Sequence, residues 1–123
     1  MFAYAFDPVS GRLGGRNLFA RLPKALGLPD GAAVDSQGGY WCALPGHGRL
    51  RRYTAKDAVD RVIALPASQP TMCTFADAKL DVLYVTSATD KLTSEQWQRK
   101  PVASALPCLR LGEKGIVRPY MLR

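Results

Sequence analysis

The sequence predicts an all-β protein built from four-stranded antiparallel sheets of the kind that form the blades of a β-propeller. Two observations carry this prediction. Short apolar or alternating segments, separated by turns rich in glycine and proline, run through most of the 123 residues, and no long stretch has helical spacing. A short strand leading by a turn into a strand headed by an aromatic residue occurs at 32–43 and again at 72–87. The offset of roughly 40 residues lies within the range of a four-stranded blade.

The first half of the chain contains an isolated strand pair and then a complete set of four strands. Strands are expected at 2–6 and 17–22, on either side of a turn at 7–12. The four strands that follow are expected at 32–34, 40–44, 50–54 and 61–65, with turns at 36–39, 45–48 and 54–57. Four short strands joined by tight turns make one blade.

The second half is less regular. Strands are expected at 71–75, at 83–87 and, after a polar insertion, around 105–111. Pro107 removes a backbone donor, so the last of these is expected to be irregular or to lie at a sheet edge. The insertion is expected to form a short helical turn at 92–97, with Trp97 packed against a blade edge.

These strands amount to about two and a half blades, whereas a closed propeller needs at least four. We divide the chain into a partial blade at 1–25, a full blade at 29–66 and the last blade at 70–123. Blades bury their faces only against neighbours. Half a ring therefore leaves apolar flanks exposed, and we expect the isolated chain to self-associate.

Composition narrows the class of protein. At this length one domain is the default, and no stretch reaches the roughly 20 apolar residues that a transmembrane helix requires. The first residues lack the basic segment of a signal peptide. We therefore expect a cytoplasmic protein with no membrane partner.

The charge balance raises the question of a polyanionic partner. Seventeen Lys and Arg against ten Asp and Glu give a formal net charge of +7. The arginines are scattered along the chain, and the tight cluster Arg49, Arg51 and Arg52 falls in a predicted strand, where neighbouring side chains face opposite sides. Nucleic-acid binding favours a continuous basic face, so no nucleic-acid partner is expected.

The cysteines and the single histidine do not indicate a metal or redox centre. Cys42, Cys73 and Cys108 are odd in number, widely spaced and set in apolar surroundings, and so are predicted to be free buried thiols. Their spacing does not match a zinc site. His47 lies in a Pro-Gly-His-Gly segment, which favours a solvated turn over a catalytic role.

One carboxylate stands out. Asp30 lies in the sequence Leu-Pro-Asp-Gly at 28–31, just ahead of a predicted strand. Proline before it fixes φ, and Gly31 after it admits backbone geometries closed to other residues. Such a turn can present a carboxylate to a hard cation or use it as a general base, although Pro-Asp-Gly is also an ordinary turn sequence. Asp35 lies in a turn closed by glycines, where turn formation is the stronger explanation.

The order and spacing of several motifs resemble the SMP-30/gluconolactonase (regucalcin-like) family of six-bladed β-propellers. The resemblance covers residues 2–110 and is to the C-terminal half of the proteins of that family. The matching segments are 2–7 with Gly11, 28–31, 34–35 with Gly38, 40–43 with Gly48 and Arg49, 65–66, 69–71, 73–75 and 83–88. Together they are far more specific than any one of them.

The resemblance implies a site and a reaction. Asp30 matches the family aspartate that coordinates a divalent cation at the propeller axis and helps to activate water against a sugar lactone. We expect Ca²⁺, with Zn²⁺, Mn²⁺ or Mg²⁺ as alternatives, and a sugar lactone as substrate. The other family ligands, a glutamate and an asparagine, have no counterpart in this sequence. The alternative interpretation is a truncated propeller without activity that acts in oligomerisation or protein interaction.

Overall fold

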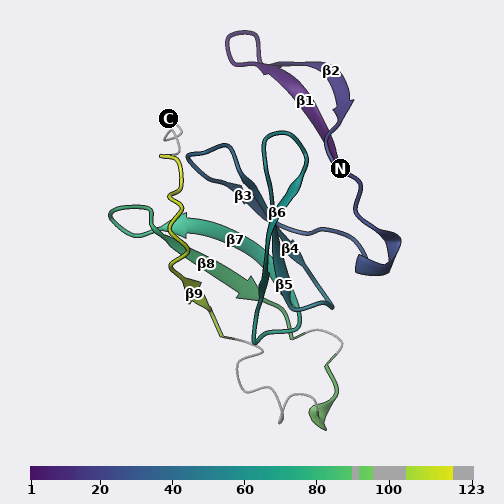
Figure 1. The fold of residues 1–123 in the computed structure, drawn as a ribbon, viewed down its shortest axis with the longest axis vertical. Coiled ribbons are helices and arrows are strands. Elements are labelled where there is room, and N and C mark those ends of the chain that lie inside the picture. The colour runs from purple at the N-terminus through teal and green to yellow at the C-terminus, as the bar shows by residue number, and fades with distance from the viewer. Residues whose placement is uncertain (90–91, 96–104, 118–123) are drawn as a thin grey trace.

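The computed structural model describes residues 1–89, 92–95 and 105–117. Within these residues nine strands form three antiparallel sheets of two, four and three strands, as Figure 1 shows. Consecutive strands lie side by side in every sheet. A 3-10 turn, η1 (Lys24–Leu26), follows the first sheet. The predicted all-β fold built from antiparallel blades is confirmed.

The N-terminal sheet is a hairpin of β1 (Phe2–Asp7) and β2 (Arg12–Leu18), which we call the arm. It stands apart from the other two sheets (Figure 1). The predicted second strand at 17–22 is wrong at both ends. The chain reverses earlier, because the Asp7 carboxylate accepts the Val9 N–H at 2.9 Å and the Gly11 N–H donates to the Asp7 carbonyl at 2.8 Å.

The second sheet, which we call the central blade, is a complete set of four strands. Its strands are β3 (Ala32–Val34), β4 (Tyr40–Leu44), β5 (Arg49–Tyr53) and β6 (Val59–Ala64). Alternate residues of β4 face opposite sides, and residues 41–44 are all buried. A strand buried on both faces explains why the sequence of β4 is continuously apolar instead of alternating.

The third sheet, which we call the last blade, contains β7 (Pro70–Ala76), β8 (Val82–Ser87) and β9 (Cys108–Leu109). The third strand is much shorter than the predicted 105–111. Pro107 has no N–H to donate, and its carbonyl accepts the Val85 N–H at 2.9 Å. The irregularity that we expected at Pro107 is therefore confirmed.

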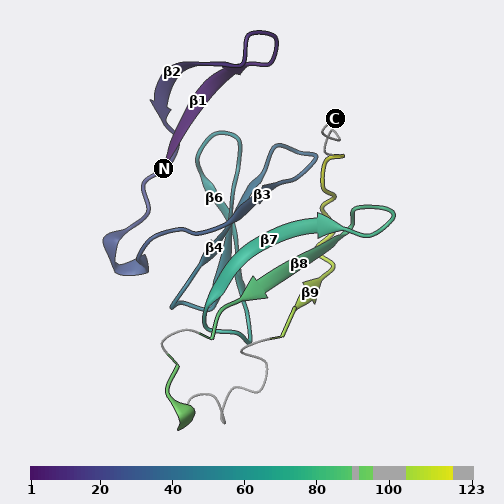
Figure 2. The same cartoon turned by 180° about the vertical axis from the view of Figure 1, so that it is seen from behind.

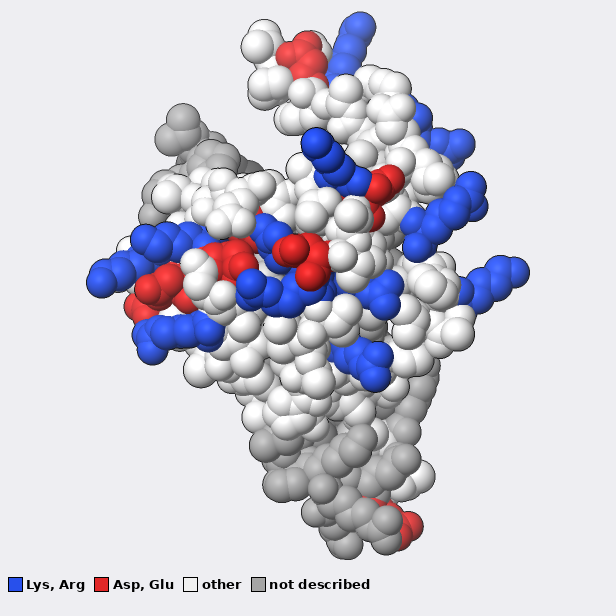
Figure 3. All heavy atoms as spheres, in the orientation of Figure 1, with Lys and Arg blue, Asp and Glu red and all other residues white. Residues whose placement is uncertain are grey.

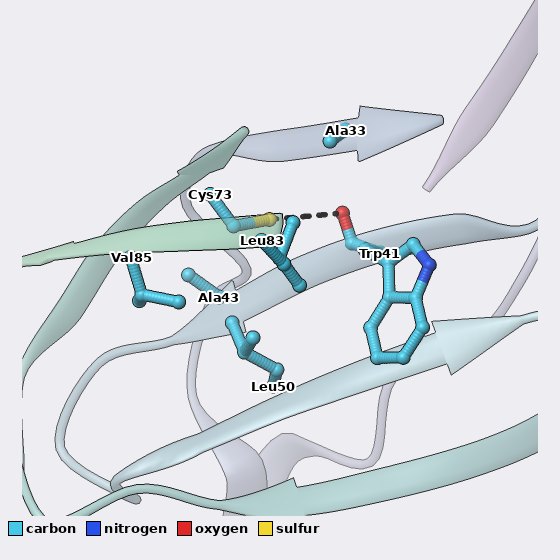
Figure 4. Packing of buried hydrophobic residues seen from close by; sticks show 7 residues of the cluster. All are labelled: Ala33, Trp41, Ala43, Leu50, Cys73, Leu83 and Val85. Carbon is cyan, nitrogen blue, oxygen red and sulfur yellow. Dashed lines mark hydrogen bonds between the residues drawn. The ribbon is translucent and has the colours of Figure 1, made fainter. Parts of the chain in front are cut away.

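The hydrophobic core lies between the central and last blades. Trp41, Ala43 and Leu50 of the central blade face Cys73, Leu83 and Val85 of the last blade, with Ala33 beside them (Figure 4). The Cys73 thiol lies 3.7 Å from the Trp41 carbonyl. Strands β3 and β7, the first of each blade, contact each other. The two sheets thus pack face to face with their first strands adjacent (Figure 2).

The opposite face of the central blade is covered by the segment that leaves the arm. The Phe19 ring packs edge-on against Tyr40 and Tyr53, at centroid distances of 5.6 and 6.0 Å. Cys42, Leu44 and Tyr53 are buried beneath this segment. The arm itself keeps its apolar side chains exposed, among them Phe2, Tyr4, Phe6, Leu13 and Leu18.

Three other predictions have mixed outcomes. Cys42 and Cys73 are buried free thiols as predicted, but Cys108 is exposed, because a strand of two residues at the sheet edge has too little structure around it. Ser94 and Glu95 are helical, as expected for the turn at 92–97, whereas Trp97 lies outside the described residues.

The division of the chain into blades at 1–25, 29–66 and 70–123 stays a prediction. No described helix is long and apolar enough to cross a membrane.

Candidate functional site

Asp30 lies at the entrance to β3, where the central blade meets the last blade. Its side chain is exposed. Its carboxylate accepts no hydrogen bond and forms no ion pair within the part of the chain that the structure describes. A carboxylate that the fold leaves unpaired on a defined strand entrance is available to an external ligand.

The backbone around Asp30 forms a bulge. The Asp30 N–H donates to the Ala43 carbonyl at 3.0 Å, and the Ala43 N–H donates to the Gly31 carbonyl, also at 3.0 Å. Two residues of one strand thus face a single residue of the next, which is the arrangement of a β-bulge. The Gly31 N–H turns away from β4 and donates to the Thr71 carbonyl of the last blade at 2.7 Å.

The glycine after Asp30 serves a purpose that the sequence interpretation missed. We expected Gly31 to provide an unusual backbone angle, but its φ is not positive. Its role is close approach, because a β-carbon there would lie 2.7 Å from the Thr71 carbonyl oxygen and 2.8 Å from the Met72 α-carbon. The packing of β3 against β7 therefore requires glycine at this position.

Asp30 does not belong to a metal-binding cluster of side chains, because among the described residues no group of three or more His, Cys, Asp or Glu is placed to hold a metal ion. An unpaired carboxylate suits one position of a hard, oxygen-coordinated cation, whereas Ca²⁺ takes about six to eight oxygens. The chemistry of the Asp30 carboxylate thus suits one of the ligands of such a cation.

Asp35, at the other end of β3, has the opposite environment. It is 1% exposed, and its two carboxylate oxygens accept five hydrogen bonds. The donors are the Gln37 N–H at 3.0 Å, the Gly39 N–H at 2.8 Å, the Trp41 indole at 2.8 Å and the Arg52 guanidinium at 2.7 and 3.2 Å. This carboxylate binds the β3–β4 turn to β5, as a structural residue would.

The electrostatics of Asp35 agree with that role. Burial alone would raise the pKa of its carboxyl, but the hydrogen bonds from Arg52, Gly39, Trp41 and Gln37 outweigh burial and hold the pKa below the usual 3.8. Arg52 also pairs with Asp60, and these partners raise the pKa of the guanidinium. The prediction that Asp35 serves turn formation agrees with this geometry. Its ion pair with Arg52 was not foreseen, because a cationic strand residue gives no sign of a partner 17 positions away.

The charge distribution around this network is mixed. On the face in Figure 3, Lys and Arg side chains are interspersed with Asp and Glu. Arg61 of β6 holds Glu113 at 2.9 Å, and the Ser36 N–H donates to the Lys114 carbonyl at 2.7 Å. The segment after β9 thus crosses from the last blade to the β3–β4 turn. His47 is exposed in the β4–β5 turn, as predicted.

The comparisons with known proteins agree on one group of relatives. Residues 1–89 match the profile of the SMP-30/gluconolactonase/LRE-like region. Regucalcin of Gallus gallus is 32% identical over 120 residues, covering 96% of this chain and 40% of its own length. The 6-deoxy-6-sulfogluconolactonase of Pseudomonas putida is 32% identical over 120 residues, covering 97% of this chain and 41% of its own.

The solved structures extend the likeness to the fold. The crystal structure of regucalcin from Agrobacterium tumefaciens, titled a calcium-binding protein, superposes with a TM-score of 0.79 at 26% identity. The match covers 94% of this chain and 38% of that one. The chain thus spans about two fifths of the length of the curated relatives that it matches.

Proposed function

This chain belongs to the SMP-30/gluconolactonase/LRE-like family, and we propose that it forms part of a metal-dependent sugar-lactone hydrolase in which Asp30 is a metal ligand and the general base. The observation that carries the proposal is the contrast within β3. The fold uses both carboxylate oxygens of Asp35, whereas no described residue bonds either carboxylate oxygen of Asp30 at the junction of two blades. One of the relatives is named as a lactonase for a gluconolactone derivative.

The chemistry assigned to Asp30 is the transfer of one proton. The oxygen of a water molecule adds to the lactone carbonyl carbon, and the Asp30 carboxylate accepts a proton from that water. The ring carbon–oxygen bond then breaks, and the departing ring oxygen takes up a proton to give the open hydroxy acid. A bound divalent cation supplies polarisation of the carbonyl. Ca²⁺ is the first choice for an oxygen ligand such as Asp30, with Zn²⁺, Mn²⁺ and Mg²⁺ as alternatives.

The test is proton release during hydrolysis of glucono-1,5-lactone by the complete polypeptide that includes these 123 residues. Activity should disappear with a chelator and return when one of the four cations is added. Hydrolysis that continues at the same rate in the metal-free protein would contradict the proposal. The 123-residue chain alone is expected to show no appreciable hydrolysis, because its described residues hold no cluster of three or more His, Cys, Asp or Glu that could bind the cation with Asp30.

A second function, self-association, rests on the arm. The side chains of Phe2, Tyr4 and Phe6 share one face of β1 and are all exposed, Phe6 by 61%. Burying such side chains is worth about 1.5 to 3 kcal/mol each, and a two-stranded hairpin alone is marginally stable in water. Light scattering on the 123-residue chain should therefore give a mass above 13.4 kDa, and Phe6→Ser should lower it. A monodisperse monomer would contradict this function.

A further inference from the structure

We infer that Gly31 is a positioning residue for Asp30, holding its carboxylate at the junction of the two blades through a hydrogen bond to the last blade. The inference rests on the proposed function, because it concerns the same carboxylate. Its evidence, however, comes from the backbone around Asp30 and from the space around Gly31.

The bulge fixes Asp30 between two strands of different blades. Its own N–H is held by the Ala43 carbonyl of the central blade at 3.0 Å, and the next N–H is held by the Thr71 carbonyl of the last blade at 2.7 Å. Bulges alter the direction of nearby side chains. The position of Asp30 is therefore set by the seam between β3 and β7 as well as by its own sheet.

The space around Gly31 makes this seam sensitive to a single methyl group. A β-carbon at position 31 would overlap the Met72 sulfur and approach the Thr71 oxygen to 2.7 Å and the Met72 α-carbon to 2.8 Å. A flexible side chain can move aside, but two of these three atoms belong to the backbone of β7. Alanine must therefore push β3 away from β7 and weaken the bond to Thr71, displacing Asp30 with it.

The chain offers matched controls. A β-carbon at Gly15 would meet no atom within 4 Å, and the φ of Gly15 is not positive, so Gly15→Ala adds the same methyl group without a clash. Met72→Ala combined with Gly31→Ala removes the side-chain overlap and leaves both backbone overlaps. We expect the double variant not to recover the wild-type position of Asp30.

The experiment is an NMR titration, with Mn²⁺ alone, of the complete polypeptide that includes these 123 residues, in which broadening of backbone amide signals reports where the ion binds. We expect broadening centred on Asp30 in the wild-type chain and its loss in Asp30→Asn. In Gly31→Ala the Mn²⁺ concentration needed for the same broadening should rise about tenfold or more, the range found when a residue that orients a metal ligand is lost. Gly15→Ala should match the wild type.

Two readouts separate positioning from stability. The Trp41 indole N–H, bonded to Asp35, should keep its shift in Gly31→Ala, because the core and the Asp35 network remain. Hydrogen exchange at the Asp30 amide should become faster in Gly31→Ala, because its bond to Ala43 belongs to the disturbed bulge.

In the wild-type chain, Ca²⁺ should slow hydrogen exchange at the Gly31 amide, since the coupling between ion binding and the contact of β3 with β7 is reciprocal. This last measurement needs no variant.

The outcomes are distinguishable. Equal Mn²⁺ broadening in Gly31→Ala and the wild type would overturn the positioning role and leave the proposed function intact. Absence of broadening at Asp30 in the wild type would count against the metal role of Asp30. The positioning role would then be decided by exchange at the Asp30 amide, and unchanged protection in Gly31→Ala would overturn it. If Gly31→Ala does not fold, hydrogen exchange in the wild type decides the question. Ca²⁺ that binds at Asp30 without slowing exchange at the Gly31 amide would then overturn the positioning role.

Discussion

Asp30 and Asp35 lie at the two ends of one short strand and have opposite environments. Asp35 is buried, accepts five hydrogen bonds and lies against a guanidinium. Asp30 is exposed and has no partner among the described residues. An aspartate thus stabilises the fold at one end of β3, whereas at the other end the described residues leave the aspartate side chain unpaired. Variants of the two residues should therefore affect different measurable quantities.

The largest expected effect is on stability. Asp35→Ala leaves the Trp41 indole N–H and the Arg52 Nε–H buried without their acceptor, while Arg52 keeps Asp60 and Gln37, and it should lower the free energy of unfolding by about 3 to 5 kcal/mol. Urea unfolding followed by circular dichroism measures it. Asp30→Ala is the matched control, and as an exposed substitution it should change the free energy by no more than about 0.5 kcal/mol. Equal losses in both variants would abolish the contrast.

A smaller loss is expected when the Asp35 network is disturbed without touching the carboxylate. A β-carbon at Gly39 would overlap the Arg52 guanidinium, so Gly39→Ala should push Arg52 away from Asp35. The expected cost is about 1 to 3 kcal/mol, as for other insertions into a packed site. Gly15→Ala should be neutral by the same urea measurement. An unchanged free energy of unfolding in Gly39→Ala would show that the Arg52 guanidinium can bind Asp35 in another side-chain conformation.

Acid should weaken the Asp35 network. Because the pKa of Asp35 in the folded chain lies below 3.8, its contribution is present above that pH and is lost as the pH falls through the folded-state pKa. As the pH decreases, the Asp35 carboxylate is protonated in the unfolded chain before it is protonated in the folded chain, so the free energy of unfolding decreases. Asp35→Asn should flatten this dependence in urea titrations from about pH 6 to 2.5. A pH dependence in Asp35→Asn that equals that of the wild type would contradict the assignment.

The smallest effect concerns the rate at which the core opens. Burial raises the pKa of Cys42 to about 11 and that of Cys73 to about 12, so at neutral pH neither is a thiolate. Cys108 is exposed and should react first with a thiol reagent. Reaction of the two buried thiols should be faster in Asp35→Asn than in the wild type and unchanged in Asp30→Asn. Mass spectrometry of labelled peptides distinguishes the three sites, and rapid labelling of Cys73 in the wild type would contradict its burial.

The fold was largely predictable from local sequence. The bounds of β3 and β4 are those predicted, because Gly31 precedes β3, Gly39 and Pro45 flank β4, and the apolar pattern of both strands is unbroken. The prediction failed where the partner is distant or the turn is closed by side chains. The Asp7 carboxylate closes a turn after β1, so β2 begins at Arg12 and not at residue 17, and too little structure surrounds Cys108 to bury it.

The site was predictable only in part. The Leu-Pro-Asp-Gly sequence drew attention to Asp30, and its place at the start of β3 agrees with the prediction. The reason for Gly31 was not visible, because the atoms that exclude a β-carbon come from a strand about 40 residues later. The partner of Asp35 is likewise remote in sequence. Close approaches between blades leave no local pattern, so they become visible only in the assembled fold.

The measurement that tests the central claim most directly compares Asp30→Asn with the wild type in the complete polypeptide, using two quantities from the same samples. These are the rate of glucono-1,5-lactone hydrolysis at saturating metal and the free energy of unfolding. We predict that the rate falls by a factor of about 100 or more, as when a general base is lost. The free energy of unfolding should stay within about 0.5 kcal/mol. A wild-type rate in Asp30→Asn, or a loss of activity that accompanies unfolding, would contradict the account.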